Sequence, residues 1–211
     1  MSETSQTIIG FQSPDGGEEL ARAEVYGLLA ELFYAPPSAE MLEQLSVAVT
    51  QAPVAGAFLE SSWGELVSAA RRLSSADIET EFVALFGGVG KPAVSLFGSW
   101  YLAGTLNQQP LADLRRTLDE LGLERPLGVL ETEDHIASLS EVMRYLIAGD
   151  DLGTSNLANQ QAFFNQHLRG WVDGLCDAVA AQVQADFYRT LAVFACDFFA
   201  IEAQGFDLLE L

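Results

Sequence analysis

Apolar residues recur at the three- and four-residue spacing of an amphipathic helix along almost the whole chain. The first clear stripe consists of Val25, Leu28, Leu29, Leu32 and Phe33. Pro36 and Pro37 follow it, and prolines at this place end a helix. The last stripe is the most regular and consists of Phe187, Leu191, Phe194, Phe198 and Ile201. These patterns predict a chain that is built from helices.

Capping and breaking residues divide the pattern between these two stripes. Ser38 can cap a second helix that runs to about residue 51, and Pro53 can open a third. Ser74 or Ser75 can cap a fourth helix, which ends at residues 87–88. Further helical patterns cover residues 99–107, 110–121, 132–148 and 156–184, the last with a break near Gly170.

Strand signals are almost absent, because the best run, AVSLF, is short and lies close to glycines. We therefore predict an all-α protein, a single helical domain of about eight to ten helices. We expect residues 1–17 to form a loose tail, residues 18–211 to form the helical domain and residues 149–155 to provide a hinge.

The charge of the chain restricts its partners. Ten basic residues stand against thirty acidic ones, which gives a formal net charge of −20 at pH 7. Such a surface repels phosphate groups, so nucleic acids and anionic membranes are poor partners. It attracts cationic partners instead, and this attraction weakens as salt is added.

The sequence shows no signal for export or for a membrane span. The N-terminus has neither a basic region nor an apolar run of about 7–15 residues, and no stretch approaches ~18 uninterrupted apolar residues. We expect a soluble cytoplasmic protein. Cys176 and Cys196 belong to no C-x-x-C pattern, so we interpret them as two buried thiols in a reducing compartment.

The longest irregular stretch is the glycine-rich segment at residues 87–99, GGVGKPAVSLFGS. It fails as a phosphate-binding loop, because Leu85 replaces the first glycine and Pro92 replaces the magnesium-binding Ser or Thr. A plain connector and a recognition surface both remain open. Phe97, Trp100 and Tyr101 favour a recognition surface, since large rings in or beside a loop commonly bind something.

Asp134 and His135 stand together at the start of a predicted helix. Thr132 is a plausible N-cap, which would place Glu133, Asp134 and His135 at the first three helical positions. Adjacent side chains on a helix point about 100° apart, so the pair cannot form the carboxylate–imidazole relay of a hydrolase. Position 138 is serine and 139 is leucine, so no second metal ligand follows at helical spacing. A structural cap and a binding hot spot remain, with no catalytic residue, metal or cofactor expected.

The other histidine has different neighbours. His167 shares an apolar helix face with Phe164, Leu168 and Trp171, which is typical of a core or boundary histidine. The arginine pairs at 71–72 and 115–116 lie within helical patterns, where we interpret them as solvated charge.

Four segments, which together span about residues 20–203 in order, carry a family resemblance. They are EVYGLLAELFYAPP, EFVALFGGVGKPAVSLFGSWYL, ETEDHIASLSEVMRYL and FFNQHLRGWVDGLCDAVAAQVQADFYRTLA. The second segment contains a G-S-x-Y/W-L motif and the third contains a D-H-I-A helix start. With these motifs the chain resembles the TorD/DmsD family of redox-enzyme maturation chaperones.

The resemblance implies an all-helical cytoplasmic chaperone, not an enzyme. Such a chaperone binds the twin-arginine signal peptide of a molybdopterin oxidoreductase and delays its export until the cofactor is in place. The peptide-binding residues that the resemblance implies are Phe82, Leu85, Phe86, Pro92, Phe97, Gly98, Ser99, Trp100, Tyr101, Glu131, Asp134 and His135. The protein would be a monomer or a domain-swapped dimer.

Elementary chemistry agrees with this expectation. A twin-arginine leader carries positive charge beside an apolar run, so its partner needs carboxylates next to an apolar groove. Asp134 and Glu131 would pair with the arginines, and His135 would orient a carboxylate or donate to a peptide carbonyl. Two alternatives stay open. One is a chaperone for a cytoplasm-facing molybdoenzyme such as nitrate reductase, without leader recognition, and the other is a small enzyme that uses Asp134 and His135.

Overall fold

The computed structural model describes residues 16–50, 59–87, 91–126 and 128–209. The helices in these residues are α1 (Gly16–Tyr34), α2 (Ala39–Val47), α3 (Glu60–Arg72), α4 (Ser75–Phe86), α5 (Gly98–Ala103), α6 (Gln109–Leu121), α7 (Ile136–Ala148), α8 (Leu157–His167), α9 (Val172–Ala180) and α10 (Phe187–Asp207). The only extended pairing among the described residues is one antiparallel bridge between Phe97 and His135. The predicted all-α fold is confirmed.

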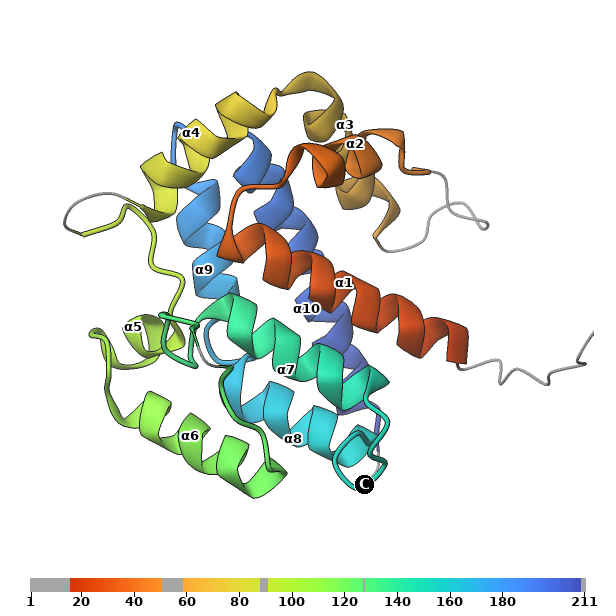
Figure 1. The fold of residues 1–211 in the computed structure, drawn as a ribbon, viewed down its shortest axis with the longest axis vertical. Helices are drawn as coiled ribbons and strands as arrows, with labels where there is room; N and C mark the ends of the chain where they lie inside the picture. The colour runs from red at the N-terminus through yellow and green to blue at the C-terminus, as the bar shows by residue number, and fades with distance from the viewer. Residues whose placement is uncertain (1–15, 51–58, 88–90, 127, 210–211) are drawn as a thin grey trace, which may run out of the picture.

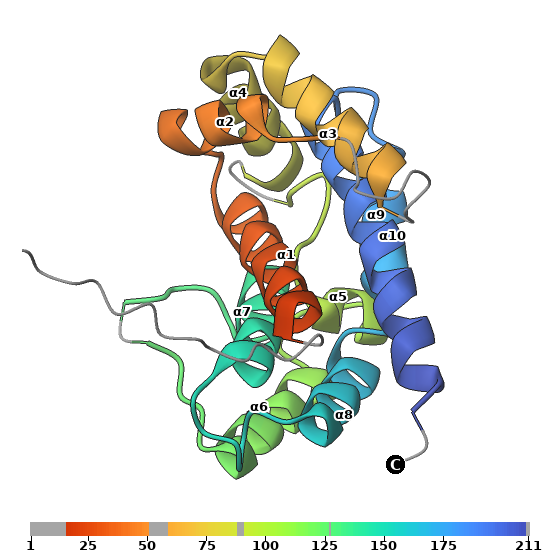
Figure 2. The ribbon, with the colours of Figure 1, turned by 90° about the vertical axis from the view of Figure 1, so that its right-hand side faces the viewer.

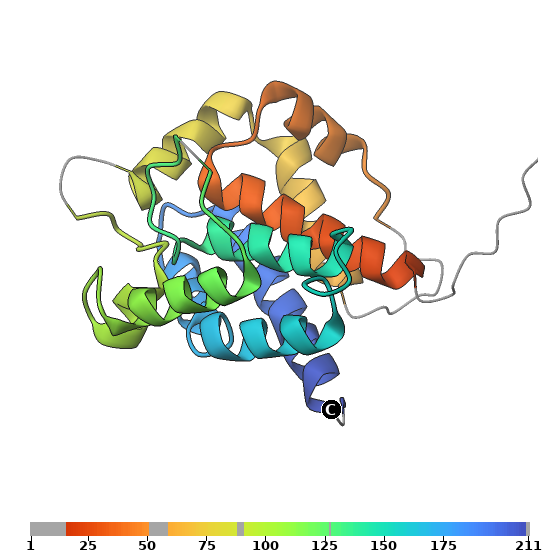
Figure 3. The ribbon, with the colours of Figure 1, turned by 60° about the horizontal axis from the view of Figure 1, so that its bottom comes forward.

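The helices pack around α1 and α10. Figure 1 shows α1 crossing the middle of the molecule, with α2, α3 and α4 toward one end and α5, α6 and α8 toward the other. Helix α1 packs along α7, which packs along α8 in turn, and Figure 3 shows these three side by side. The long helix α10 packs against α9 and α3 and runs along one side of the molecule in Figure 2. One connected cluster of buried apolar side chains includes residues from every described helix except α5, whose partly buried Tyr101 packs against it.

Local caps explain where several helices begin. The Ser38 hydroxyl accepts the Met41 backbone N–H at 3.1 Å, as expected for an N-cap. Ser74 and Asp77 cap each other's backbone in a capping box at the start of α4. Helix α2 ends at Val47, before the predicted residue 51, and α3 begins at Glu60. The predicted start at Pro53 lies outside the described residues.

The predicted break near Gly170 is present. Helix α8 ends at His167 and α9 begins at Val172, with a turn between them. The Trp171 indole Nε1 donates to the His167 backbone carbonyl at 2.7 Å and so holds this turn together.

The buried Glu81 carboxylate joins α4 to the start of α10. It accepts the backbone N–H groups of Asp186, Phe187 and Tyr188 at 2.8, 3.0 and 2.8 Å. The first N–H groups of a helix have no partner inside the helix, and they carry partial positive charge. The Glu81 side chain therefore supplies the acceptors for three N–H groups at the start of α10.

A second buried carboxylate joins α10 to α1. Glu202 forms a bidentate ion pair with Arg22 at 2.7 and 2.8 Å, and it also accepts the Tyr26 hydroxyl at 3.0 Å. Arg22 donates further to Gln160 on α8 at 3.2 Å. A buried charge of this kind is tolerated because it is both paired and hydrogen-bonded.

The structure can be compared with the predicted start of the helical domain and with the predicted hinge. Helix α1 begins at Gly16, within the last two residues of the predicted tail, and residues 1–15 lie outside the described part. The segment 149–155 connects α7 to α8 through a turn in which Asp151 accepts the Gly153 N–H at 2.9 Å. Its role as a hinge stays a prediction. Among the described helices, none combines the length and apolar character that a membrane span requires.

Replacing Glu81 with alanine should lower the free energy of unfolding by about 2–4 kcal/mol, because three buried N–H groups lose their acceptor. Glu81→Gln should cost less, since the amide keeps one acceptor oxygen. Urea unfolding followed by circular dichroism measures both. Glu79→Ala, at an exposed position of the same helix, is the control and should change stability little. Equal effects at the two positions would contradict this role of Glu81.

Candidate functional site

The three predicted residues on α4 are part of the packed interior. Leu85 is fully buried, and Phe82 and Phe86 are half-buried. Their rings lie against Tyr188 of α10, with centroids 5.6 and 5.1 Å away. These side chains hold α4 on α10, and the two phenylalanine rings are only partly exposed to a partner.

The segment after α4 is held by its own aromatic residues. The Tyr101 hydroxyl donates to the Ser95 carbonyl at 2.8 Å, and its ring stacks on Trp171 at 5.5 Å. The Lys91 ammonium lies 4.2 Å from the centre of the Trp100 ring, a cation–π contact. Gly98 allows a close approach here, because a Cβ at this position would lie 3.0 Å from the Trp171 indole and would push the ring away.

Asp134 is buried and clamps the start of α5. Its Oδ2 accepts both the backbone N–H of Ser99, at 3.0 Å, and the Ser99 hydroxyl. Its Oδ1 accepts the Thr132 hydroxyl at 2.6 Å. Main-chain bonds support the clamp, since Gly98 donates to the Asp134 carbonyl and Ile136 donates to the Leu96 carbonyl, each at 2.9 Å. The side chain thus acts as an N-cap supplied from another segment.

His135 itself is the N-cap of α7, so the prediction that Thr132 caps this helix is wrong. The Ala137 N–H donates to His135 Nδ1 at 3.1 Å, and the helix begins at Ile136. The reason is tertiary, because Asp134 is held by α5 and cannot join the helix. Burial lowers the pKa of His135 to about 4, although Glu131 and Asp134 oppose that shift. The ring is therefore neutral, with its proton on Nε2.

Aromatic rings surround His135. Phe97 lies edge-on at 5.0 Å and Tyr34, at the end of α1, lies edge-on at 6.3 Å. Glu131 is close to Tyr34, and its negative charge raises the pKa of the tyrosine hydroxyl. One carboxylate oxygen of Glu131, Oε2, is buried without a hydrogen-bond partner in the described part of the chain. Such an atom favours a donor from outside.

A groove of about 610 Å³ opens beside these residues, between α1, α6, α7 and the segment that precedes α7. Apolar side chains line much of it, among them Ala30, Tyr34, Leu118, Leu123, Val129 and Val142. Carboxylates at its border are Glu31, Glu124, Glu133 and Glu141. We define these residues together as the α1–α7 groove.

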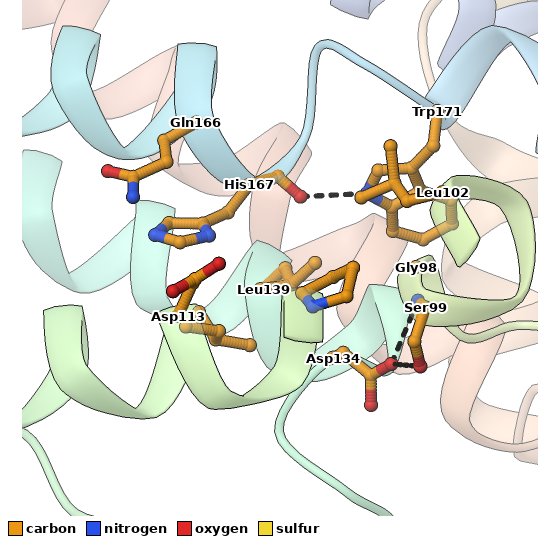
Figure 4. Close-up of a pocket in the computed structure, with 11 residues that line it drawn as sticks. Gly98, Ser99, Leu102, Asp113, Asp134, Leu139, Gln166, His167 and Trp171 are labelled. Carbon is orange, nitrogen blue, oxygen red and sulfur yellow. Dashed lines mark hydrogen bonds between the residues drawn. The ribbon is translucent and has the colours of Figure 1, made fainter. Parts of the chain in front are cut away.

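A second hollow, of about 260 Å³, lies between α5, α6 and the end of α8. Figure 4 shows His167 above Asp113 on one side, with Asp134 and Ser99 on the other. His167 is buried, and burial lowers its pKa to about 4. The prediction of a core or boundary position for His167 is confirmed, but the side chain also borders this pocket. We define these residues, with Trp171, as the α5–α6 pocket.

Sequence reasoning missed most residues of both hollows. Tyr34 and Asp113 were not among the predicted site residues, and Asp113 is one acidic residue among thirty. Each hollow combines segments that are distant in the chain, so no local pattern marks it. Among the predicted residues, Gly98, Ser99 and Asp134 do line the α5–α6 pocket.

The two cysteines form a separate pair. Cys176 is buried on α9, Cys196 is half-buried on α10, and both are free thiols that contact each other. Burial raises the pKa of each thiol, which makes them poor nucleophiles. The described residues contain no cluster of three or more side chains suited to a metal ion.

A family model now places this arrangement among known proteins. The model described as nitrate reductase delta subunit matches residues 55–177, more than half of the 211-residue chain. The chain belongs to this family. The nitrate reductase delta subunit family comprises chaperones that mature redox enzymes, so the match confirms the family resemblance that the motifs predicted.

One solved structure has the same fold as this protein. It is a crystal structure of an Archaeoglobus fulgidus protein that was provisionally assigned as a redox enzyme maturation protein. The two chains are 15% identical and superimpose with a TM-score of 0.55, over 94% of this chain and 99% of that one. Comparison with curated proteins found no match.

Asp134→Ala should lower the free energy of unfolding by about 2–4 kcal/mol, because two hydroxyls and one backbone N–H lose their acceptor. Ser99→Ala removes only the hydroxyl partner and should cost about 1 kcal/mol. Chemical unfolding measures both variants. If the two substitutions cost the same, the carboxylate does not act as a clamp.

Both histidines should titrate near pH 4, not near their ordinary pKa of 6.5. Because the pKa is lower in the folded state, the unfolded chain binds protons first. This contribution to stability is complete above pH 6.5 and is lost as the pH falls toward 4, about 1–3 kcal/mol per histidine. NMR of the two imidazole Hε1 signals gives the pKa values. His135→Asn keeps a capping acceptor and identifies its signal, and titration near 6.5 would contradict the buried neutral rings.

Proposed function

We propose that this protein is a maturation chaperone that binds the twin-arginine leader of a molybdopterin oxidoreductase subunit. The observation that carries the proposal is the α1–α7 groove, which combines an apolar floor with unpaired carboxylates. An apolar or amphipathic peptide that lies in such a groove buries its apolar face, and this is a common mode of recognition.

The carboxylates of the groove divide into paired and unpaired groups. Glu133 is paired with Arg115 at 2.8 Å and with Arg125 at 3.6 Å, and Glu141 is paired with Arg144 at 2.7 Å. By contrast, no ion pair engages Glu31 or Glu124 within the described residues. These two side chains can receive the positive charge of a leader without breaking an existing bond.

Tyr34 connects the groove to the residues that the sequence predicted. It lines the groove and also contacts His135, while Glu131 lies close to it. We therefore propose that Glu131 receives a donor from the peptide. Pro92, Phe97 and Trp100 would extend the binding surface beyond His135, and Asp134 and His135 would hold that surface in shape.

A second client class is favoured by the family match itself. A chaperone related to nitrate reductase delta subunits would assemble a cytoplasm-facing molybdoenzyme and bind its apo-subunit without a leader. The enzymatic alternative has less support, because the Asp134 oxygens already accept hydrogen bonds and His135 Nδ1 accepts a backbone N–H. We propose a cytoplasmic, non-enzymatic role for the helical domain at residues 18–211.

Calorimetric titration of the full chain with a synthetic twin-arginine leader tests the proposal. We expect binding that weakens as salt rises and that weakens further when both leader arginines become glutamine. Reversing two groove charges with Glu31→Lys and Glu124→Lys should weaken binding about tenfold or more.

Reversing Glu65 and Glu79 together with Glu65→Lys and Glu79→Lys, at exposed positions of α3 and α4, is the matched control for the net charge. An equal loss in this control would mean that the overall charge, not the groove, attracts the peptide. Binding of the whole apo-subunit without binding of the leader would favour the second client class and contradict leader recognition.

A further inference from the structure

The α5–α6 pocket contains a buried carboxylate, Asp134, without a paired cation in the described residues. Asp134 is 4% exposed, and its side chain accepts two hydroxyls and, at the start of α5, one backbone N–H. The described residues offer it no ion pair. Ionised carboxylates are almost never buried without a paired cation. The pocket therefore presents a buried carboxylate that has hydrogen-bond donors but no paired cation in the described residues.

The hydrogen bonds of His167 define which of its nitrogens can accept. The Thr117 hydroxyl donates to the Asp113 carbonyl at 3.3 Å, so its proton is already used. We therefore assign His167 Nε2, which lies 2.9 Å from the Thr117 oxygen, as the donor of that hydrogen bond. A neutral imidazole with its proton on Nε2 has an unprotonated Nδ1. This nitrogen accepts no bond from the described residues, although the side chain is only 7% exposed.

Asp113 provides a third acceptor beneath the imidazole (Figure 4). Its two neighbours on α6, Gln109 and Arg116, both donate to Oδ1, at 3.0 and 2.5 Å. The second oxygen, Oδ2, has no partner in the described part of the chain. Arg116 offsets part of the charge of Asp113 but is exposed, so water screens this pair.

Apolar side chains and one indole complete the walls. Trp171 is fixed by its bond to the His167 carbonyl and by Tyr101, which stacks on its ring. Leu102, Leu114 and Leu139 line the rest of the space. These walls suit the methylene stem of a long basic side chain, whose charged end would reach the acceptors.

We propose that the α5–α6 pocket binds a guanidinium group on an apolar stem, which is the side chain of an arginine. A guanidinium has five N–H donors in a plane, and the pocket presents acceptors at Asp113, Asp134 and His167. An ammonium has only three donors and a stronger hydration shell, so it fits this set less well. Anionic ligands are excluded by the two carboxylates.

The source of the arginine rests on the proposed function, in which the partner is a twin-arginine leader. A free guanidinium compound has the same chemistry, so the experiment includes both. The full chain is titrated with the leader, with leaders in which each arginine is replaced by neutral citrulline, and with N-acetyl-arginine amide.

The two amides that resemble histidine provide matched variants. His167→Asn keeps an acceptor near the position of Nδ1, whereas His167→Gln reaches Thr117 but has no acceptor near Nδ1. We expect His167→Gln and Asp113→Asn each to weaken binding about fivefold to twentyfold, and His167→Asn to weaken it less. A leader in which citrulline replaces the arginine that enters the pocket should bind all variants equally. Thermal unfolding shows which variants remain folded.

The possible results distinguish an error in the assignment of the pocket from an error in the choice of the leader as partner. If the leader binds all variants equally, the pocket does not hold an arginine and the inference is wrong, while the proposed function stands. If the leader fails but N-acetyl-arginine amide binds with the expected sensitivity to the variants, the pocket is right and the leader is the wrong partner. If neither ligand binds, the inference is overturned.

Discussion

The hydrogen bonds from Asp134 to the start of α5 are the constraint on which the candidate site depends. They set the position of Ser99 and Gly98, and Gly98 in turn allows the Trp171 indole to approach its backbone. The segment that contains Gly98 also pairs with the backbone around His135. Helix α7 begins one residue after His135. Two hollows therefore share one wall, since residue 133 borders the α1–α7 groove and residue 134 borders the α5–α6 pocket. A displacement of this wall would change both.

Three carboxylates of the described residues are buried, and each is accommodated in a different way. Glu81 is buried against backbone N–H groups at a helix start, Glu202 against a bidentate arginine, and Asp134 against hydroxyls and one N–H. The first two interactions bring positive charge, partial or full, to the carboxylate. The third brings only one such N–H group. Asp134 is thus the buried carboxylate at which the electrostatics of the fold leave room for an external cation.

The fold could be predicted from the sequence because its determinants are local. Stripes of apolar residues mark the helices, and Ser38 and Ser74 mark two starts through bonds to residues three positions away. The start of α7 could not be predicted this way. Thr132 is an acceptable local cap, but Asp134 is held by Ser99, thirty-five positions away, and this moves the cap to His135. The hollows depend on tertiary contacts throughout, so their residues had no sequence signal beyond the family motifs.

The double role of Asp134 explains why the D-H motif is hard to interpret by substitution alone. Removing the carboxylate removes both a structural clamp and a negative charge, so a loss of peptide binding would not show which role was lost. His167 and Asp113 do not share this problem, because neither caps a helix from another segment. His167 reaches the pocket from α8, and its Nδ1 supports no described contact. Recognition at this pocket can therefore be separated from folding at these two positions, but not at Asp134.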